Sequence, residues 1–333
     1  LARLRWGWLV HNVFTVWAFL VAAGLVWGGN ALGGFIGVDL LDWAARSLGW
    51  HGFWHWPSMV AAVAGLGLLG VAGLAVVFVT ENWGFRLTRV HGPSNSTLRT
   101  QKGLFSTREV NRDEARLRGV QLDQPLLWRW MGTTGTVAIS TGLSVFSEGR
   151  DLLPRTNIST AQAVAARVLP AAGPLFARRL GRHPRAALRR RVVRAVAAVG
   201  VFTGLVAYSG RVASLIPDSA WIYCVSIGLP LGLGLAVASY LSLGHAVEGD
   251  FIVTRSGVLS RATAVLRRRS VIGWTFKQSV FHRRAGLLTV TATTAAGDRA
   301  YTVLDTAEAD ALDFADRATP ELLHPFLVDG PGS

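Results

Sequence analysis

One stretch of this chain occurs twice, and the repeat limits the possible folds more than any other feature. Residues 103–141 align with residues 257–295 without a gap. A fixed internal period is the signature of a folded unit that is used more than once. Identical residues mark the alignment along its length: Gly103/Gly257, Ser106/Ser260, Gly119/Gly273, Gln124/Gln278, Arg129/Arg283, Gly132/Gly286 and Ala138/Ala292.

Long uncharged stretches precede each copy of the repeat. The chain has 333 residues, half of them hydrophobic, which exceeds the usual share in a soluble protein. Runs of roughly 20 apolar residues are long enough, at about 1.5 Å per residue, to cross a bilayer. The sequence predicts two pairs of membrane helices, one within residues 6–80 (spans about 8–27 and 58–79) and one within 192–245 (spans about 192–208 and 221–243).

The two soluble parts show the alternating pattern of short strands, and each ends in one helix. We expect them at residues 83–176 and 248–327, with terminal helices at 161–169 and 307–318. Residues 177–191 form a basic linker, and residues 328–333 a disordered tail. The predicted fold class is therefore membrane α-helical plus α+β: twice over, a helix pair followed by a bent β-sheet that a C-terminal helix caps.

Arginine supplies nearly all the positive charge of a chain whose net charge is +14, as a GC-rich source would explain. Clustered arginines attract anionic lipid or an acidic partner, but at a membrane edge they can also act only as a cytoplasmic topology signal. No aromatic residues interleave with them, so we expect no nucleic-acid partner. The candidate contact residues are Arg178, Arg179, Arg182, Arg185, Arg189, Arg190, Arg191, Arg194, Arg267, Arg268 and Arg269.

Motifs of known enzymes and cofactor sites are missing or out of context. The Gly65–Gly70 segment reads GxGxxG, but it lies inside an uncharged apolar run, where small residues favour close helix packing over nucleotide binding. No P-loop, HExxH or GxSxG motif occurs, and Cys224 is the single cysteine. We expect no enzyme activity and no cofactor.

One histidine pair has the spacing of a metal site. His51 and His55 stand four residues apart, and Asp39 or Asp42 would have to complete the site. The favoured interpretation is an interfacial aromatic belt with hydrated histidines, so we expect no metal. Asp39 and Asp42 themselves belong to a short amphipathic segment that we expect on the membrane surface.

The repeated motif resembles that of a known family. Residues 116–132 read RLRGVQLDQPLLWRWMG, and residues 269–287 read RSVIGWTFKQSVFHRRAGL. This is similar to the motif of YdbT-like bacterial membrane proteins with pleckstrin-homology-like (PH-like) domains, here of actinobacterial type. The resemblance implies a seven-stranded bent sheet capped by a helix, and no known reaction. Larger members of that family carry three modules, so a chain that starts at Leu1 fits one that has lost its first.

The motif residues have two interpretations, a structural one and a ligand or partner surface. The structural one is favoured: the glutamines bridge backbone groups, the arginines pair with carboxylates or cap carbonyls, and the glycines supply a backbone angle that other residues resist. Ser279 replaces the proline in the second copy. The motif residues are Gln124, Pro125, Arg129, Gly132, Gln278, Arg283 and Gly286.

Two hypotheses for the function follow. The first is a non-enzymatic, multi-pass protein of the bacterial plasma membrane, whose cytoplasmic modules bind a partner protein or anionic lipid, in envelope maintenance or resistance to membrane-active agents. The second is a transport or lipid-handling component that the modules regulate. The apolar spans carry no charged residue in their middle, with His11 and Arg194 at edges, which gives transport little support. Homo-oligomers through edge strands or small-residue helix faces are a further expectation.

Overall fold

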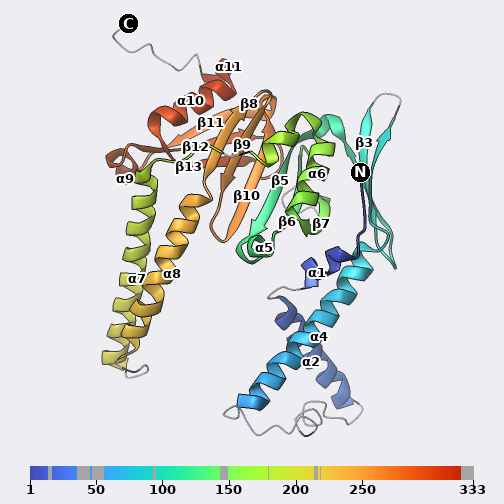
Figure 1. Ribbon diagram of the computed structural model, residues 1–333, viewed down its shortest axis with the longest axis vertical. Coiled ribbons are helices and arrows are strands. Elements are labelled where there is room, and N and C mark those ends of the chain that lie inside the picture. The colour runs from blue at the N-terminus through green and yellow to red at the C-terminus, as the bar shows by residue number, and fades with distance from the viewer. Residues whose placement is uncertain are drawn as a thin grey trace. The chain divides into compact units, whose positions relative to one another are not determined.

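The computed structural model describes residues 1–13, 17–35, 46, 56–92, 95–142, 149–178, 180–213, 217 and 219–323 (Figure 1). Contacts divide the chain into two compact units. The first comprises Leu1–Ala115, Trp130–Gly135 and Leu152–Val164, and the second comprises Arg116–Arg129, Thr136–Asp151 and Ala165–Ser333. The expected modules 83–176 and 248–327 therefore do not coincide with the compact units, because strands of the first copy pack with the second.

The first unit combines a pair of apolar helices with a small antiparallel sheet of order β1-β2-β3-β4. Residues ahead of the first helix add an unexpected edge strand, in which Ala2 pairs with Leu87. The elements that lie wholly or mostly in this unit are β1 (Ala2–Arg3), α1 (Gly7–Val13), α2 (Trp17–Phe35), α4 (Trp56–Asn82), β2 (Arg86–His91), β3 (Ser96–Lys102), β4 (Arg108–Asp113), η1 (Glu114–Arg116), β7 (Asp151–Asn157) and α6 (Ile158–Val168).

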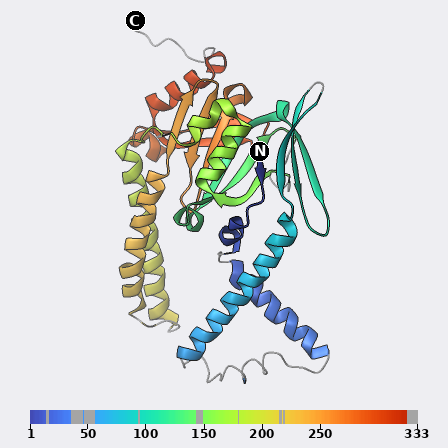
Figure 2. The ribbon, with the colours of Figure 1, turned by 45° about the vertical axis from the view of Figure 1, so that its right-hand side comes forward.

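Helices α2 and α4 cross each other within this unit (Figure 2). At the crossing, a side chain on Gly70 would overlap the carbonyl oxygen of Ala18, so close packing needs a glycine there. At Gly65, the other end of the same GxGxxG segment, a Cβ atom would meet no other atom within 4 Å. Helix packing, and not a nucleotide site, thus explains the second half of this segment.

Three described helical stretches are long and apolar enough to cross a membrane: Val60–Asn82, Arg185–Arg211 and Ala220–Leu241. In the place of the expected first span at about 8–27, the described residues form α1 and α2, with residues 14–16 outside the described part, and the apolar stretch found in α2 is Leu20–Ala31. The expected surface segment and the histidine pair, with Asp39, Asp42, His51 and His55, lie outside the described residues, as does the tail.

The second unit holds the other helix pair and two sheets. One sheet includes the order β6-β5-β10-β9-β8, and the other has the order β11-β12-β13. The elements are β5 (Leu117–Pro125), α5 (Leu126–Trp130), β6 (Thr133–Ser140), η2 (Pro170–Phe176), α7 (Arg185–Ala213), α8 (Ala220–Leu241), β8 (Gly244–Glu248), β9 (Phe251–Ser256), β10 (Ser260–Arg267), η3 (Arg268–Ser270), β11 (Val271–Lys277), α9 (Val280–Arg284), β12 (Leu287–Thr294), β13 (Ala300–Ala307), α10 (Glu308–Ala318) and α11 (Pro320–Leu323).

The ungapped alignment of the two copies is confirmed element by element. A shift of 154 residues moves 126–130 onto 280–284 and 133–140 onto 287–294, which are the bounds of α5 and α9 and of β6 and β12. Gly103 and Gly257 have similar positive φ angles of 117° and 108°. The repeat in the sequence is therefore a repeat in the backbone.

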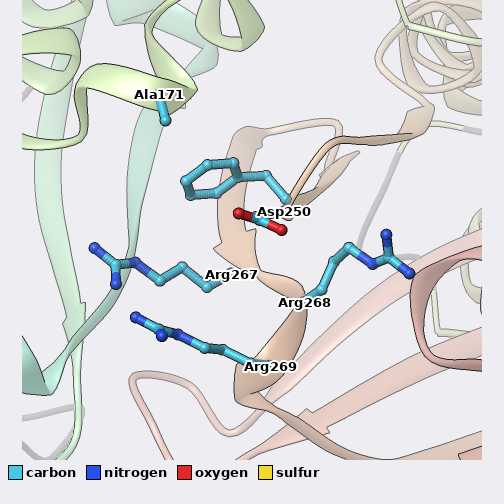
Figure 3. Close-up of a pocket in the computed structure, with 6 residues that line it drawn as sticks. Ala171, Asp250, Arg267, Arg268 and Arg269 are labelled. Atoms are coloured by element: carbon cyan, nitrogen blue, oxygen red, sulfur yellow. The ribbon is translucent and has the colours of Figure 1, made fainter. Parts of the chain in front are cut away.

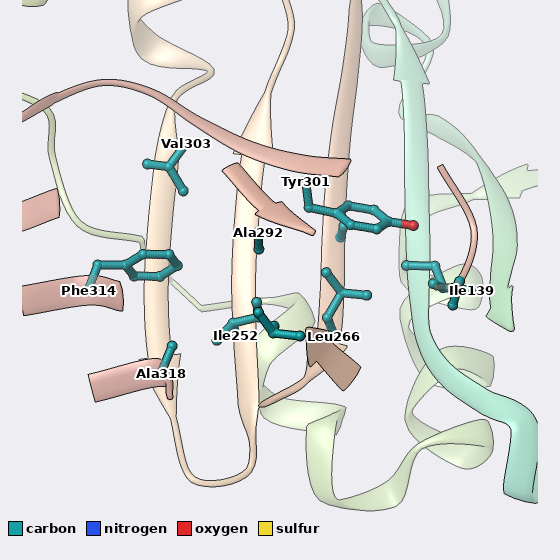
Figure 4. Packing of buried hydrophobic residues seen from close by; sticks show 11 residues of the cluster. Ile139, Ile252, Leu266, Ala292, Tyr301, Val303, Phe314 and Ala318 are labelled. Carbon is teal, nitrogen blue, oxygen red and sulfur yellow. The ribbon is translucent and has the colours of Figure 1, made fainter. Parts of the chain in front are cut away.

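The main core of the second unit lies between its sheets and the terminal helix α10 (Figure 4). Helix α10 buries Ala311, Phe314, Ala315 and Ala318, which share one face because they are three or four residues apart. Phe314 belongs to the same core cluster as Ile252 and Leu266 from β9 and β10. The predicted capping helix is thus confirmed, although it begins after Ala307 and not after Thr306.

Candidate functional site

Three consecutive arginines form the charged wall of a pocket in the second unit. Strand β10 ends at Arg267, and the short turn η3 carries Arg268 and Arg269. The Ser270 hydroxyl closes this turn by donating to the carbonyl of Arg267 at 2.5 Å. A 3₁₀ turn has about three residues per turn, so successive side chains point in different directions.

Arg268 has a structural role. Its Nε donates to the carbonyl of Ala318 at 2.6 Å, and its Nη1 donates to the carbonyl of Gly249 at 3.1 Å. Ala318 is the last residue of α10, where carbonyl groups lack partners within the helix. Arg268 therefore caps the terminal helix and fixes it to the β8–β9 turn.

Arg267 and Arg269 point to the other side and leave Arg268 alone on its side (Figure 3). With Arg268, Asp250, Phe251 and Ala171 they line a pocket of about 440 Å³. Three arginines against one carboxylate make the lining of the pocket cationic. Arginine binds phosphate and carboxylate groups through paired N–H donors. The pocket is therefore a candidate site for an anionic group.

This pocket lies at the end of strand β8 that is remote from helix α8; Figure 1 shows β8 and α8. Strand β8 starts at Gly244, directly after α8, and Asp250 follows its other end. Five residues at about 3.3 Å each separate the two ends by roughly 17 Å. Arg267 lies at the same far end, because it pairs with Phe251. The pocket and the end of α8 thus lie at opposite ends of β8.

A second charged cluster, centred on Asp305, joins α7 to the terminal part of the unit. The Asp305 side chain is only 5% exposed and accepts from Arg191 Nη2 at 2.7 Å. Arg190 Nη1 also donates to this carboxylate, and His282 Nε2 lies 3.0 Å from it. Burial raises the pKa of Asp305, but the hydrogen bonds and charges of Arg191, His282 and Arg190 outweigh this effect and hold the pKa below its ordinary value.

Two histidines, one buried and one half-buried, pack beside this cluster. The rings of His183 and His245 meet edge to face, with centroids 5.1 Å apart, and His245 meets Phe314 in the same way. Burial, helped by the charges of His245 and Arg191, lowers the pKa of His183 to about 4. Burial also lowers the pKa of His245. Among the described residues, no group of three side chains could hold a metal.

The comparison with known families agrees with this architecture. The family model of the bacterial PH domain matches residues 10–172 and, a second time, residues 193–318. The chain belongs to the bacterial PH domain family. No curated protein and no solved structure matches it. The predicted fold class is confirmed: two bacterial PH domains with antiparallel sheets and a C-terminal helix, together with apolar helices long enough for a membrane.

The arginines expected to act together ahead of the second bacterial PH domain have different surroundings. Arg178 forms an ion pair with Glu248 at the far end of β8, and Arg190 and Arg191 bind Asp305. Arg182, Arg185, Arg189 and Arg194 are exposed. Arg179 lies outside the described residues. On α7, the exposed members of this set are Arg185, Arg189 and Arg194.

The motif residues of the second unit make structural contacts. Gln124 Oε1 accepts from Arg261 Nε at 3.1 Å, which links β5 to β10. Gln278 Nε2 donates to the Leu287 carbonyl at 3.3 Å and lies 3.2 Å from Glu308 Oε2. Arg283 is exposed on α9.

The other motif positions lie at turns. Pro125 ends β5, and Ser279, its counterpart, caps α9 by accepting from the backbone N–H of His282. Arg129 is half-buried in α5. Gly132 and Gly286 have φ angles of 67° and 61°, a region that favours glycine.

Sequence reasoning missed Asp305. Its signal is weak, a lone acidic residue in an otherwise neutral strand, three residues before the first residue of α10. The same position in the first copy, three residues before α6, holds Arg155. Arg155 Nη1 donates to the carbonyl of His11, and Asn12 Nδ2 donates to the carbonyl of Arg155 at 2.9 Å. Both copies thus anchor the helix that precedes their domain, with opposite charges.

Proposed function

We propose that this protein is a non-enzymatic, multi-pass protein of the bacterial plasma membrane that presents its bacterial PH domains to the cytoplasm as docking modules. The second domain recognises an anionic group, carboxylate or phosphate, on a cytoplasmic partner through Arg267 and Arg269. The exposed arginines of α7 contact anionic lipid of the inner leaflet. One observation carries the proposal: the arginine pocket lies at the end of β8 that is remote from α8.

The charge distribution supports this division between two surfaces. Arg185, Arg189 and Arg194 are exposed on the candidate span Arg185–Arg211. Basic residues next to a membrane attract anionic lipid by about 1 kcal/mol each and keep their side cytoplasmic. Of the pocket arginines, Arg269 is exposed and Arg267 is half-buried, so a protein partner would meet Arg269 first.

The transport alternative has no supporting observation in the described spans. Charged residues there lie towards the span ends, at Glu81, between Arg185 and Arg194, and at Arg211. An ion or substrate path across a membrane usually needs ionisable groups near the middle.

The test uses the full chain in nanodiscs and two probes. Microscale thermophoresis measures the binding of a short polyglutamate peptide and of inorganic phosphate, which separates carboxylate from phosphate recognition. Thermal unfolding is compared between phosphatidylcholine nanodiscs with and without phosphatidylglycerol. Loss of one charge-assisted contact should weaken peptide binding about tenfold in Arg269→Gln.

The matched control changes the arginines on α7 and leaves the pocket intact. The double variant Arg185→Gln/Arg189→Gln should bind the peptide normally but lose the stabilisation by phosphatidylglycerol, whereas Arg269→Gln should keep it. Equal losses in both variants would show a general charge effect and contradict the proposal. If the parent chain bound neither the peptide nor phosphate, the proposal would be contradicted as well.

A further inference from the structure

The two copies are joined inside the second unit by one strand pair. Strand β5 of the first copy and β10 of the second pair antiparallel over seven residues, from Ser260↔Pro125 to Leu266↔Gly119. A side chain on Gly119 would overlap the carbonyl oxygen of Val265. The N–H of Leu126 also donates to the carbonyl of Leu259 in the β9–β10 hairpin at 2.6 Å. This pair has a fixed register and needs a glycine where the backbones approach.

Because the sequence repeats, β5 has a counterpart in the second copy and β10 has a counterpart in the first copy. The shift of 154 residues places β4 (108–113) on residues 262–267 of β10, and residues 117–123 of β5 on β11 (271–277). Within the second unit, β5 and β10 pair with each other. In the part of the chain that the structure describes, β4 ends the sheet β1-β2-β3-β4 and β11 ends the sheet β11-β12-β13. One edge of each kind is therefore left over.

The left-over edge of β11 has the features of an interface without its partner. Phe276 is 39% exposed, whereas its counterpart Leu122 in the internal pair is 3% exposed. Ile272 on β11 and Phe281 on α9 are also exposed. Gly273, the counterpart of Gly119, lacks any atom within 4 Å of the position of a Cβ, and its φ is not positive. Nothing in the described chain requires glycine here, but an approaching strand would.

The matching feature on the β4 side is the β3–β4 hairpin. Its Phe105 is 88% exposed and is the counterpart of Leu259. Gly103 has the same type of positive φ as Gly257, so the two hairpins turn alike. Unpaired edges of this kind readily add another strand.

We propose that β11 of one copy of this chain pairs with β4 of a second copy, in the register that β5 and β10 use internally. Transfer of that register places Gly273 opposite Arg112, Trp274 opposite Asn111 and Thr275 opposite Val110. The partner is a second copy of this chain because the internal pair already shows that strands of these two kinds fit together. The contact joins β11 of one chain to β4 of another, which leaves one β4 and one β11 unpaired in the complex. These two strands pair either with each other, in a dimer with two equivalent contacts, or with further chains in a ring. The native mass gives the number of chains.

Disulfide crosslinking tests the register. In a Cys224→Ser background, Val110→Cys and Thr275→Cys chains are purified separately in detergent, mixed and oxidised. The mixture should give a crosslinked dimer on a non-reducing gel, and neither variant alone should. Phe276→Cys mixed with Val110→Cys is the register control and should crosslink far less, because neighbouring residues of a strand point to opposite faces. Gln121→Cys/Ala264→Cys in one chain is the positive control for the internal pair.

Three outcomes overturn the proposal. Crosslinking of Thr275→Cys with itself would show a two-fold β11–β11 contact. Crosslinking within one chain that carries both substitutions would show that β4 and β11 meet internally. A single-chain mass of the unmodified protein in native mass spectrometry would exclude the assembly without any variant.

A charge test probes the same register independently of cysteines. The register places Lys277 opposite Arg108, and like charges directly across a sheet disfavour pairing. Lys277→Glu should therefore strengthen self-association by about threefold or more. Adding Arg108→Glu to Lys277→Glu restores like charges and should return association to that of the parent. Weaker association in Lys277→Glu than in the parent would contradict the register.

Discussion

Asp305 accepts a hydrogen bond from Arg191 at 2.7 Å, and this contact fixes the first turns of α7 to strand β13 of the second bacterial PH domain. Arg191 also donates to the hydroxyl of Ser239 on α8, so both helices of the pair reach the same junction. A candidate membrane helix pair is thus connected to the domain by a buried charge cluster, and not only by the covalent chain.

Neutralising Asp305 should loosen this junction. Asp305→Asn leaves Arg190 and Arg191 without their carboxylate, and removal of one partner of a buried ion pair costs about 3–5 kcal/mol. We expect a lower midpoint of thermal unfolding and faster proteolysis between η2 and α7. The control is Asp298→Asn, which removes the more exposed partner of Arg150 and should cost less than about 1 kcal/mol. Equal effects of the two variants would refute the special role of Asp305.

The stability of the second unit should fall as the pH drops from about 6.5 towards 4. Burial, with the charges of His245 and Arg191, lowers the pKa of His183 to about 4, whereas unfolded histidine titrates near 6.5. The unfolded state takes up the proton first, so the contribution is complete above about pH 6.5 and is lost below it. The free energy of unfolding should change by up to about 1.4 kcal/mol per pH unit for each such histidine.

His245→Phe separates the histidines from other acid effects. It keeps an aromatic ring against Phe314 and removes one group whose pKa burial lowers. Unfolding followed from pH 7 to pH 4 should then show a shallower decline than in the parent. An identical decline would mean that other groups cause the acid sensitivity.

The two glycines of the repeated strand should respond differently to alanine. Gly119→Ala forces a methyl group against the carbonyl of Val265, and overpacking of this kind costs about 1–3 kcal/mol. Gly273→Ala meets no atom within 4 Å, so the monomer should unfold as before. Denaturation measured beside native mass spectrometry should show lower stability in the first variant and weaker self-association in the second. Unchanged assembly in Gly273→Ala would argue against the pairing of β11 with β4.

Neighbouring arginines of the pocket should have separate roles. Arg268→Gln removes donors from the carbonyls of Ala318 and Gly249, so the unfolding free energy should fall by about 1–3 kcal/mol. Arg269→Gln changes an exposed side chain and should alter stability by less than about 0.5 kcal/mol. Thermal unfolding of both variants without ligand checks this. Similar losses in both would remove the distinction between a structural and a binding arginine.

Local patterns in the sequence were sufficient for the elements. The alternation of residues and the ungapped repeat predicted matching strands, and a capping residue followed by residues 307–318 predicted the terminal helix, which the structure shows as Glu308–Ala318. These features depend on neighbours within a few residues, because helix and strand each have a fixed period. The second pair of long apolar helices was also predicted, although α7 begins at Arg185, well before the expected residue 192.

The candidate site was predicted only in part. The run Arg267–Arg269 was found by its charge, but its composition could not show that Arg268 caps α10 while Arg269 faces a pocket. In the sequence, nothing distinguishes Arg190 and Arg191 from their neighbours Arg185 and Arg189. In the structure, Arg190 and Arg191 pair with the Asp305 carboxylate because β13 lies beside them. A side chain's role depends on which distant backbone or charge lies beside it.

The sequence by itself determined the repeat, the order of its strands and helices, and the apolar spans, because each is written in the periodicity of adjacent residues. The tertiary structure decided that β5 pairs with β10 and that Asp305 meets α7. This strand pair and this ion pair each join residues that are more than a hundred positions apart in the sequence. Their free energy depends on packing and desolvation of the whole unit, which no local pattern contains.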